Sequence, residues 1–345
     1  MSKKILITGG AGFIGVNAAD TFARKGWQVT VLDNLSRVGT EGNLVWLRTR
    51  VPSLAFERLD VRHQDAVAGF FKTQRFDVIL HLAAQVAVTT SVTSPREDFD
   101  INALGTFNVL EAMRLHNPEA QLIYASTNKV YGKMTNVTVS ERHGRYEYES
   151  LTEGVAEDQP LDFYSPYGCS KGSADQYVLD YFRIYGLRTT AFRQSCIYGT
   201  RQFGVEDQGW VAWFTIASML GRPITIYGDG KQIRDVLWVD DLVAAYEAAI
   251  ENDQAANGQA FNIGGGPSNT LSLLELIAML EEKIGRKISL RFTDWRPGDQ
   301  PVFVCNLEKA KRLLRWEPSV NAAAGVEKLS TWVGASRDLF SPRAE

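Results

Sequence analysis

The stretch KILITGGAGFIG, residues 4–15, joins a short apolar run to a glycine-rich turn. The run KILIT has the length and the apolar content of a buried strand. Gly9, Gly12 and Gly15 follow it directly, with the spacing of a turn whose backbone approaches a pyrophosphate. The residues after this turn predict a helix over 13–25, whose free N-terminal amides would attract phosphate oxygens. We therefore expect a strand–turn–helix unit that binds a dinucleotide.

The next predicted strand, WQVTVLD, ends at Asp33, 18 positions after Gly15. A carboxylate at this place can accept both hydroxyls of an adenosine ribose, and it would repel a 2′-phosphate. This favours NAD over NADP, although the nearby Arg37 leaves NADP open because a guanidinium binds phosphate. Asp60 and Val61 follow a third predicted strand and are candidates to bracket the adenine. For Asp60, the alternative is a side chain that caps the following helix.

Strands and helices alternate through the first half of the chain. Further strands are predicted at 54–60, 76–84, 121–126 and 187–193, with a helix over 102–116. This alternation indicates an α/β fold with a doubly wound parallel sheet, in which ligands bind at the carboxyl ends of the strands. Glycine- and tryptophan-rich loops after residue 197 indicate a second lobe. The expected division is a Rossmann NAD-binding domain over 1–197 and 233–258, and a smaller mixed α/β substrate-binding lobe over 198–232 and 259–345.

Composition argues against several classes of protein. The chain has 345 residues and a formal net charge of −3, which indicates no basic surface for nucleic acid. Its three cysteines are far apart in the sequence, so they fit neither a disulfide framework nor a metal site. No stretch is long enough to span a membrane, and the N-terminal apolar run is too short for a signal peptide. We expect a cytoplasmic protein without a metal, a nucleic-acid partner or a membrane partner.

A second candidate motif is YSPYGCSK, residues 164–171. Tyr167 and Lys171 lie four positions apart on a predicted helix, so they share a face. An ammonium beside a phenol favours the phenolate and lowers the phenol's pKa, which makes Tyr167 a usable acid or base near neutral pH. Tyr164 lacks such a partner, because Gly168 stands four positions after it. Taken alone, a Tyr–Lys pair at this spacing is weak evidence of catalysis, and a solvated helix face is its usual interpretation.

Together these motifs resemble the extended short-chain dehydrogenase/reductase family, which contains NAD-dependent sugar-nucleotide epimerases and dehydratases. The resemblance covers nearly the whole chain and rests on TGGAGFIG, DNLS, HLAA, NALGTFNVLEA, ASTNKVYG, YxxxK, GDGKQIRDVLWVDD, FNIGGG and RPGD. It implies a triad in which Thr127 hydrogen-bonds the sugar hydroxyl that is oxidised, Tyr167 takes its proton, and Lys171 holds the nicotinamide ribose. The cofactor-binding residues expected from the motifs and the resemblance are Gly9, Gly12, Phe13, Ile14, Gly15, Asp33, Asn34, Ser36, Arg37, Asp60, Val61, Leu82, Ala83, Ala84, Gln85, Asn102, Tyr167 and Lys171.

The segment ASTNKVYG, residues 125–132, narrows the reaction. Family members that dehydrate sugars follow the threonine with Asp and Glu, which act as acid and base in the removal of water. Here Asn128 and Lys129 follow Thr127, and neither suits that role, because Asn does not titrate and Lys is normally protonated at neutral pH. The segment therefore favours epimerisation or simple dehydrogenation over dehydration and decarboxylation.

A narrower pattern resembles the family members that epimerise a CDP-hexose at carbon 2. It consists of QVAVTTS, STNKVYG, DFYSPYGCSKGSADQYVLDY, RQFG with DQGWVAWF, and GKQIRDVL. The implied reaction is transient oxidation to a 2-keto sugar nucleotide and hydride return to the opposite face, with NAD retained. The alternatives are another nucleotide-sugar epimerase, such as a 4-epimerase acting on a UDP- or CDP-sugar, and a dinucleotide-binding regulator with a dormant site.

The nucleotide diphosphate of such a substrate requires cations, and guanidinium groups suit phosphate oxygens. The expected substrate-binding residues are Gln85, Thr90, Thr127, Asn128, Lys129, Gln194, Ser195, Arg201, Gln208, Trp210, Arg234 and Arg296. For Trp210, a place in the core is an equal alternative. The long polar stretch 133–163 is a candidate flap over the site. The resemblance also implies a homodimer, or a tetramer built from it, through the helices near 102–116 and 167–185.

Overall fold

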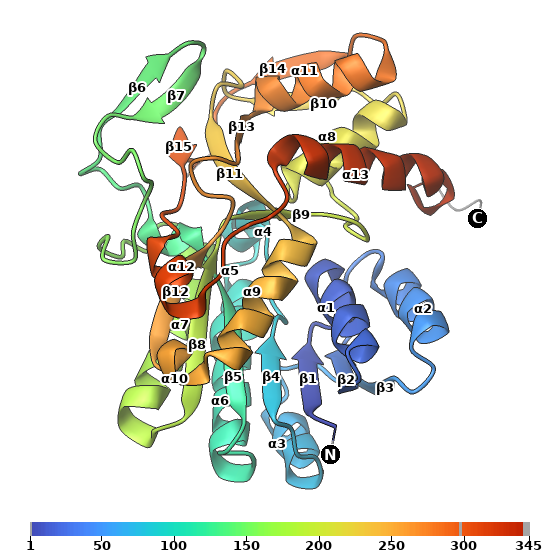
Figure 1. Cartoon of the computed structure of the whole chain (residues 1–345), viewed down its shortest axis with the longest axis vertical. Helices are drawn as coiled ribbons and strands as arrows, with labels where there is room; N and C mark the ends of the chain where they lie inside the picture. The colour runs from blue at the N-terminus through green and yellow to red at the C-terminus, as the bar shows by residue number, and fades with distance from the viewer. Residues whose placement is uncertain (1, 297–298, 341–345) are drawn as a thin grey trace.

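The computed structural model describes residues 2–296 and 299–340. Its centre is a seven-stranded parallel sheet with the order β12-β8-β5-β4-β1-β2-β3 (Figure 1). This arrangement confirms the predicted α/β fold, and it adds β12, which the sequence did not indicate as part of the sheet. The strands are β1 (Lys4–Thr8), β2 (Gln28–Asp33), β3 (Ala55–Arg58), β4 (Val78–His81), β5 (Gln121–Thr127), β8 (Arg188–Gln194) and β12 (Gln259–Ile263).

Helices cover both faces of this sheet. One face carries α1 (Phe13–Arg24), α2 (Thr40–Arg50) and α9 (Val239–Glu251), and the other carries α3 (Gln64–Thr73), α6 (Gly105–His116) and α7 (Pro166–Tyr185). Strand β1 shows why both faces are needed: Ile5 and Ile7 lie in the core under α1, whereas Leu6 lies in the core under α3 and α6. A strand that is apolar at successive positions must be buried on both sides, as parallel sheets are.

Short helical segments complete this part of the chain. They include α4 (Val88–Thr93), α5 (Pro95–Phe99), the π-helical turn η1 (Asp100–Leu104), the 3-10 turn η2 (Asn128–Tyr131), α10 (Asp253–Ala256) and α12 (Glu308–Leu314); the 3-10 turn η3 (Arg337–Phe340) packs instead on the smaller lobe described next. The predicted helix over 102–116 thus begins as a π-helical turn and continues as α6. Turns of this kind occur frequently near functional sites.

A smaller lobe lies at the top of Figure 1, beyond the large sheet. Its helices α8 (Trp210–Met219), α11 (Leu273–Ile284) and α13 (Ala322–Ala335) share a third apolar core. Helix α11 begins at a capping box, in which Ser272 and Glu275 satisfy each other's backbone amides. Strand β10 (Ile224–Tyr227) pairs in parallel with β14 (Leu290–Thr293) above these helices.

Two strands do not lie where the predicted domain boundaries put them. Strand β12, expected in the smaller lobe, pairs with β8 at the edge of the large sheet. Strand β11 (Ile233–Trp238), expected in the NAD-binding domain, forms a separate sheet with β9 (Cys196–Tyr198), β13 (Thr270–Ser272) and β15 (Val302–Phe303). A short apolar run predicts a buried strand but carries no information about the sheet that the strand joins.

The segment 133–163 forms a hairpin, β6 (Val139–Arg142) and β7 (Arg145–Tyr148), that docks on the smaller lobe. The Tyr146 amide donates to the Lys231 carbonyl at 3.1 Å, and the Tyr148 hydroxyl donates to the Val302 carbonyl at 3.1 Å. None of residues 133–163 lines the cavity described below. A flap over the site therefore stays a prediction, and in this structure the hairpin is bonded to the smaller lobe.

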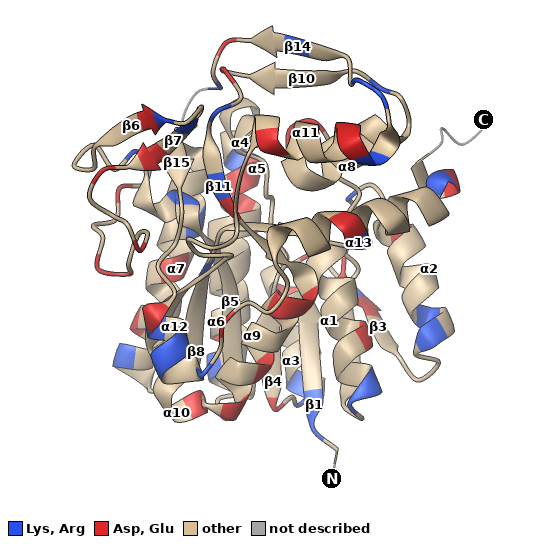
Figure 2. Cartoon of the chain, turned by 45° about the horizontal axis from the view of Figure 1, so that its top comes forward, with Lys and Arg blue, Asp and Glu red and all other residues tan. Residues whose placement is uncertain are grey.

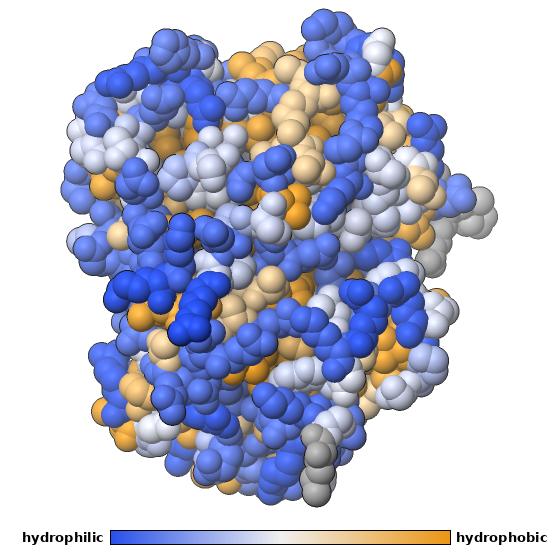
Figure 3. Space-filling model, viewed as in Figure 1, coloured by the Kyte–Doolittle hydropathy of each residue, from blue (hydrophilic) through white to orange (hydrophobic). Residues whose placement is uncertain are grey.

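The surface carries both signs of charge. Figure 2 shows acidic and basic residues interspersed along the outer helices rather than gathered by sign. On the face shown in Figure 3, hydrophilic residues separate smaller hydrophobic areas. Among the described residues, no helix combines the length and the apolar character that crossing a membrane would require.

Candidate active site

The glycine turn after β1 has the shape that a dinucleotide needs. Gly9 has φ +66°, and a Cβ built there would lie 2.7 Å from the Ala83 amide nitrogen. A Cβ on Gly15 would collide with the backbone oxygen of Gly9. Helix α1 follows Gly12, which provides no side-chain cap, so the first amides of the helix are available to phosphate oxygens. These residues fit the pyrophosphate of NAD as the sequence predicted.

Asp33 lies at the end of β2, beside this turn. Its carboxylate accepts hydrogen bonds from the amides of Ala11 at 3.0 Å and Leu35 at 2.8 Å. Burial raises the pKa of Asp33, and backbone hydrogen bonds from Leu35 and Ala11 oppose this rise. Arg37, whose guanidinium could bind the 2′-phosphate of NADP, donates to the Gln208 side chain at 2.5 Å.

Asp60 and Asn34 form a polar group at the ends of β2 and β3. Asn34 donates to Asp60 at 2.9 Å, and Arg62 forms an ion pair with Asp60 at 2.7 Å. Burial alone would raise the pKa of Asp60, but hydrogen bonds from Arg62 and Asn34 hold it well below its usual range. Asp60 does not cap α3, because His63 is the N-cap residue there. Val61 is buried beside this group, and Ser36 is exposed, with its amide bonded to Asn34.

The loop after β4 is held by its own polar contacts. The amides of residues 82 and 83 donate to the Thr8 hydroxyl at 3.2 and 3.3 Å. Asn102 binds both backbone groups of Gln85, accepting from its amide at 2.9 Å and donating to its carbonyl at 3.0 Å. The Gln85 side chain donates to Asp98 at 2.8 Å. Gln85 and Asn102 therefore shape the loop that contacts the glycine turn, and residues 82–84 form its backbone.

The three predicted catalytic residues come together at the end of β5 and the start of α7. Helix α7 begins at Ser165, whose hydroxyl accepts from the Gly168 amide at 3.1 Å, and its first turns carry Tyr167 and Lys171. The Thr127 hydroxyl lies close enough to the Tyr167 phenol to lower the pKa of the phenol. All three side chains are buried, with residue exposures of 7% for Thr127, 8% for Tyr167 and 3% for Lys171. Burial of this kind excludes bulk water from the reacting groups.

The pKa values of this group differ from the prediction. Burial raises the pKa of Tyr167 to about 12, although the hydrogen bond from Thr127 and the charge of Arg37 oppose it. Burial lowers the pKa of Lys171 to about 7, and the charges of Asp98 and Asp175 oppose that change. The Lys171 ammonium donates to the Ala125 carbonyl at 2.6 Å and lies 4.2 Å from the Tyr124 ring centre. In the chain alone, Lys171 therefore does not lower the pKa of Tyr167 as predicted, because burial dominates.

A cavity of about 590 Å³ opens at this group, in the size range of small-molecule sites. Nine of the predicted substrate residues line it: Thr127, Asn128, Lys129, Gln194, Ser195, Gln208, Trp210, Arg234 and Arg296. Sequence reasoning missed several others that line it, including Val86, Thr89, Thr93, Glu206, Asp207, Tyr227, Gln232 and Asp299. Three of these could have been noticed in the sequence: Glu206 and Asp207 directly precede Gln208, and Asp299 ends the RPGD motif.

Three predicted substrate residues do not line the cavity. Gln85 is engaged with Asp98, as described above. Thr90 is exposed, and Thr89 on the same short helix takes the inward position. Arg201 is buried elsewhere, with its guanidinium 4.4 Å from the ring centre of Trp46 in α2.

Two lining residues also have structural partners beneath the cavity. Gln194 donates to the Tyr246 hydroxyl at 2.7 Å. The Ser195 hydroxyl donates to the carboxylate of Asp235, a fully buried group that also accepts from the Cys305 thiol at 2.9 Å. Burial raises the pKa of Asp235. This network holds the floor of the cavity in place.

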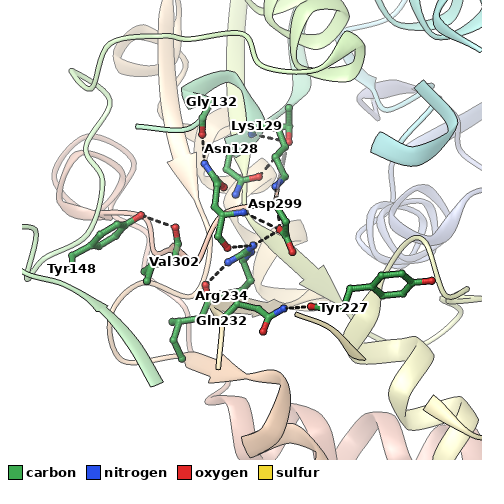
Figure 4. Close-up of polar contacts among 12 residues, drawn as sticks. Asn128, Lys129, Gly132, Tyr148, Tyr227, Gln232, Arg234, Asp299 and Val302 are labelled. Atoms are coloured by element: carbon green, nitrogen blue, oxygen red, sulfur yellow. Dashed lines mark hydrogen bonds and ion pairs between the residues drawn. The ribbon is translucent and has the colours of Figure 1, made fainter. Parts of the chain in front are cut away.

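Cations and carboxylates form a linked group on the cavity wall (Figure 4). Arg234 donates to Asp299 at 2.6 Å, and the Lys129 ammonium lies 3.8 Å from the same carboxylate. Burial lowers the pKa of Lys129, while the charge of Asp299 opposes this. Burial alone would raise the pKa of Asp299, but Arg234 and Lys129 outweigh it and hold that pKa below its usual range. Two cations thus share one carboxylate at a wall that a diphosphate could contact.

Arg296 lies at the outer end of the cavity. Its guanidinium stacks 3.8 Å from the ring centre of Tyr227 and forms an ion pair with Asp207 at 2.9 Å. Residues 297 and 298 of the RPGD motif lie outside the described residues.

Comparisons with known proteins agree with this arrangement. A model of the NAD dependent epimerase/dehydratase family matches residues 5–264. The chain is 45% identical to CDP-paratose 2-epimerase of Salmonella typhi, over 96% of this chain and 99% of that protein.

Solved structures show the same fold. UDP-glucose 4-epimerase of Thermotoga maritima, solved with UDP-glucose, is 30% identical, with a TM-score of 0.83 and coverage of 98% of this chain and 100% of that one. UDP-glucose 4-epimerase of Thermus thermophilus, solved with NAD, is 29% identical, with a TM-score of 0.81 and coverage of 96% and 99%. The glycine turn and Asp33 fit the same cofactor, NAD. The chain therefore belongs to the NAD dependent epimerase/dehydratase family, within the extended short-chain dehydrogenases/reductases.

Proposed function

We propose that this enzyme epimerises a CDP-hexose at carbon 2, in a reaction of the CDP-paratose to CDP-tyvelose type. The observation that carries the proposal is the single cavity that Thr127, Tyr167 and Lys129 line, in which the Lys129 ammonium lies 3.8 Å from the Asp299 carboxylate. This end of the cavity can oxidise and reduce a hydroxyl but lacks an acid–base pair at positions 128 and 129. The 45% identity to a CDP-paratose 2-epimerase supports the choice of sugar nucleotide and of carbon.

The cofactor would be held by residues that the fold already positions. The amides at the start of α1 would bind the pyrophosphate, Asp33 the adenosine ribose, and Lys171 the nicotinamide ribose. When bound, NAD supplies reversible hydride acceptance.

Residues of the chain would transfer the proton and hold the sugar in position. Tyr167 would take the proton of the 2-hydroxyl as a general base and return it after the sugar has turned. Thr127 would hold the same oxygen and stabilise the phenolate of Tyr167 through its hydrogen bond. The cavity volume of about 590 Å³ leaves room for a hexose to present either face.

Residues 128 and 129 do not favour the elimination of water from the sugar. Asn128 carries no titratable group, and its side-chain oxygen lies 3.4 Å from the Thr127 hydroxyl. Lys129 lies in the ion-paired group with Asp299 and Arg234, where its charge suits a phosphate oxygen. Lys129 and Arg234 would therefore anchor the diphosphate about which the sugar turns.

NMR of the purified protein with CDP-paratose and, separately, CDP-glucose tests the proposal, in deuterated water and with no added cofactor. We expect inversion at carbon 2 without deuterium uptake, because the hydride is returned directly. Inversion with deuterium at carbon 2 would contradict the mechanism. Inversion of UDP-glucose at carbon 4, with both CDP-sugars unchanged, would instead support the alternative of a 4-epimerase. Tyr167→Phe is the control, since it should abolish turnover while bound NAD remains detectable by its absorbance.

We also propose that two copies pair through α6 and α7. The outer sides of these helices expose large apolar side chains, including Leu115 at 56%, Tyr177 at 48% and Tyr185 at 51%. Contiguous apolar side chains of this kind mark interaction surfaces. Sedimentation of the purified enzyme would show a single monomeric species if this pairing is wrong.

A further inference from the structure

The outer end of the cavity holds Glu206, an exposed residue whose carboxylate forms no ion pair among the described residues. Three carboxylates line the cavity, those of Glu206, Asp207 and Asp299. Asp207 is ion-paired with Arg296 at 2.9 Å, and Asp299 is ion-paired with Arg234 at 2.6 Å. Among the described residues, the Glu206 carboxylate has only a neutral partner, the Tyr227 hydroxyl, which donates to it at 3.2 Å.

Water can solvate an exposed carboxylate, but in a cavity that receives a diphosphate this charge would also repel the ligand. Its presence is favourable when the bound molecule offers a hydrogen-bond donor to it, since hydrogen bonds to charged acceptors are the stronger ones. The ligand should therefore carry a donor group near Tyr227, on the part of the molecule away from its phosphates.

A second acceptor lies at the same end of the cavity. Gln232 is 3% exposed, and its side-chain nitrogen donates to the Tyr227 carbonyl at 2.6 Å (Figure 4). Because a backbone carbonyl only accepts, this contact fixes the orientation of the amide group. The Gln232 side-chain oxygen then has no partner among the described residues, although it is buried. Buried acceptors are normally satisfied, so this oxygen also indicates a donor on the ligand.

The position of these acceptors relative to the catalytic group identifies the part of the ligand. Figure 4 shows Lys129 above the ion pair of Arg234 and Asp299, and Tyr227 below it and to the right. The sugar must reach Thr127, two residues before Lys129, and the diphosphate would lie along Lys129 and Arg234. The nucleobase then falls at the Tyr227 end, where the planar stack of Arg296 on Tyr227 offers a flat surface.

We propose that Glu206 determines nucleobase specificity by accepting a hydrogen bond from the exocyclic amine of cytosine. A carboxylate accepts from this amine, as it does in the recognition of cytosine in nucleic acids. Uracil and thymine carry a carbonyl oxygen at the same ring position, and that oxygen would face the Glu206 carboxylate without a hydrogen between them. The inference deepens the proposed function and rests on it only in requiring a pyrimidine nucleoside diphosphate in this cavity.

The test is calorimetric titration of the NAD-loaded enzyme with CDP and with UDP, which carry no sugar. We expect the wild type to bind CDP at least 10-fold more tightly than UDP. Glu206→Gln should reduce this ratio of affinities to about threefold or less. The variant should bind CDP more weakly, because the carboxylate is lost, and UDP more tightly, because a glutamine amide can rotate to donate to the uracil carbonyl. Glu206→Asp retains the carboxylate and should keep a preference for CDP.

Asp207→Asn is the matched control, since it removes the same charge one residue away. It should change the affinities for CDP and UDP by similar factors and leave their ratio intact. If Glu206 only held Tyr227 in place, Glu206→Gln would lower the affinities for CDP and UDP by the same factor. That result would overturn the proposal. Equal affinity of the wild type for CDP and UDP would overturn it without any variant.

This titration separates the inference from the proposed function. A CDP preference that Glu206→Gln removes would stand even if the enzyme inverted a carbon other than carbon 2. Conversely, inversion of CDP-paratose at carbon 2 with no effect of Glu206→Gln on the ratio would refute only the role of Glu206.

Discussion

Replacement of Thr127 by valine tests how the catalytic tyrosine is tuned. Valine is close to threonine in shape, so the substitution removes the hydroxyl but keeps the branched side chain. In the structure, that hydroxyl lies close to the Tyr167 phenol and lowers its pKa, against the burial that raises the pKa to about 12. Without the hydroxyl, the phenolate loses a donor and the pKa of Tyr167 must rise further.

The size of the effect follows from the energy of such a bond. A hydrogen bond to a charged group contributes about 1.5–3 kcal/mol, and one pKa unit corresponds to about 1.4 kcal/mol. The pKa of Tyr167 should therefore rise by about one to two units. Tyr167 must be deprotonated to take the proton, so kcat/KM rises with pH until this pKa is reached. At a fixed pH below it, the variant should be about 10- to 100-fold slower.

The assay is the initial rate of epimerisation of CDP-paratose between pH 6.5 and 10, with bound NAD measured by absorbance. Thr127→Ser, which keeps the hydroxyl, should have the wild-type pH profile. The hydroxyl also accepts from the Lys129 amide at 3.2 Å, so thermal unfolding of both variants must be measured to account for the lost cap. Because the pKa of Tyr167 lies above this range in both enzymes, their rates should rise in parallel with pH, with Thr127→Val slower at every point. A Thr127→Val enzyme as fast as the wild type across the range would refute the reasoning.

Two further predictions concern the cofactor site and the core. Gly15→Ala should greatly reduce the NAD that is retained on purification, because the new Cβ would collide with the Gly9 carbonyl; full NAD content measured by absorbance would refute the packing role of Gly15. His81 is fully buried between the hydroxyls of Thr8 and Thr106, and burial lowers its pKa to about 3. Because the unfolded chain then binds the proton more readily, stability should fall as the pH drops from about 6.5 towards 3, by up to about 1.4 kcal/mol per pH unit. His81→Gln should flatten this dependence in thermal unfolding across pH 5–7.5, and an equally steep dependence in the variant would contradict the assignment.

The features that could be predicted from the sequence are those encoded by neighbouring residues. The glycine turn, Asp33 and the pair Tyr167–Lys171 each lie within one strand–turn–helix unit or one helix, so spacing alone predicts their geometry. Thr127 could be placed near Tyr167 because the strand end and the helix start meet at the same edge of a parallel sheet.

The features that could not be predicted depend on contacts between distant segments. Strand β11 joins β13 and β15 rather than the large sheet, and no local pattern specifies that choice. Arg201 was expected to bind phosphate, but the contact with Trp46 turns it towards α2. The pKa of Tyr167 was expected to fall because of Lys171, whereas burial by the surrounding fold raises it.

The structure separates the chemistry of the cavity from its recognition of the substrate. Thr127, Tyr167 and Lys171 lie on β5 and α7 of the large sheet, where helix packing and burial fix their geometry. Glu206 and Tyr227 lie on a loop and a strand of the smaller lobe, linked to each other by a single hydrogen bond. Lys129 and Asp299 join the two regions through one long ion pair. Changes at the Glu206 end could therefore alter the nucleobase without moving the proton-transfer group, whereas changes at position 128 or 129 would act directly beside Thr127.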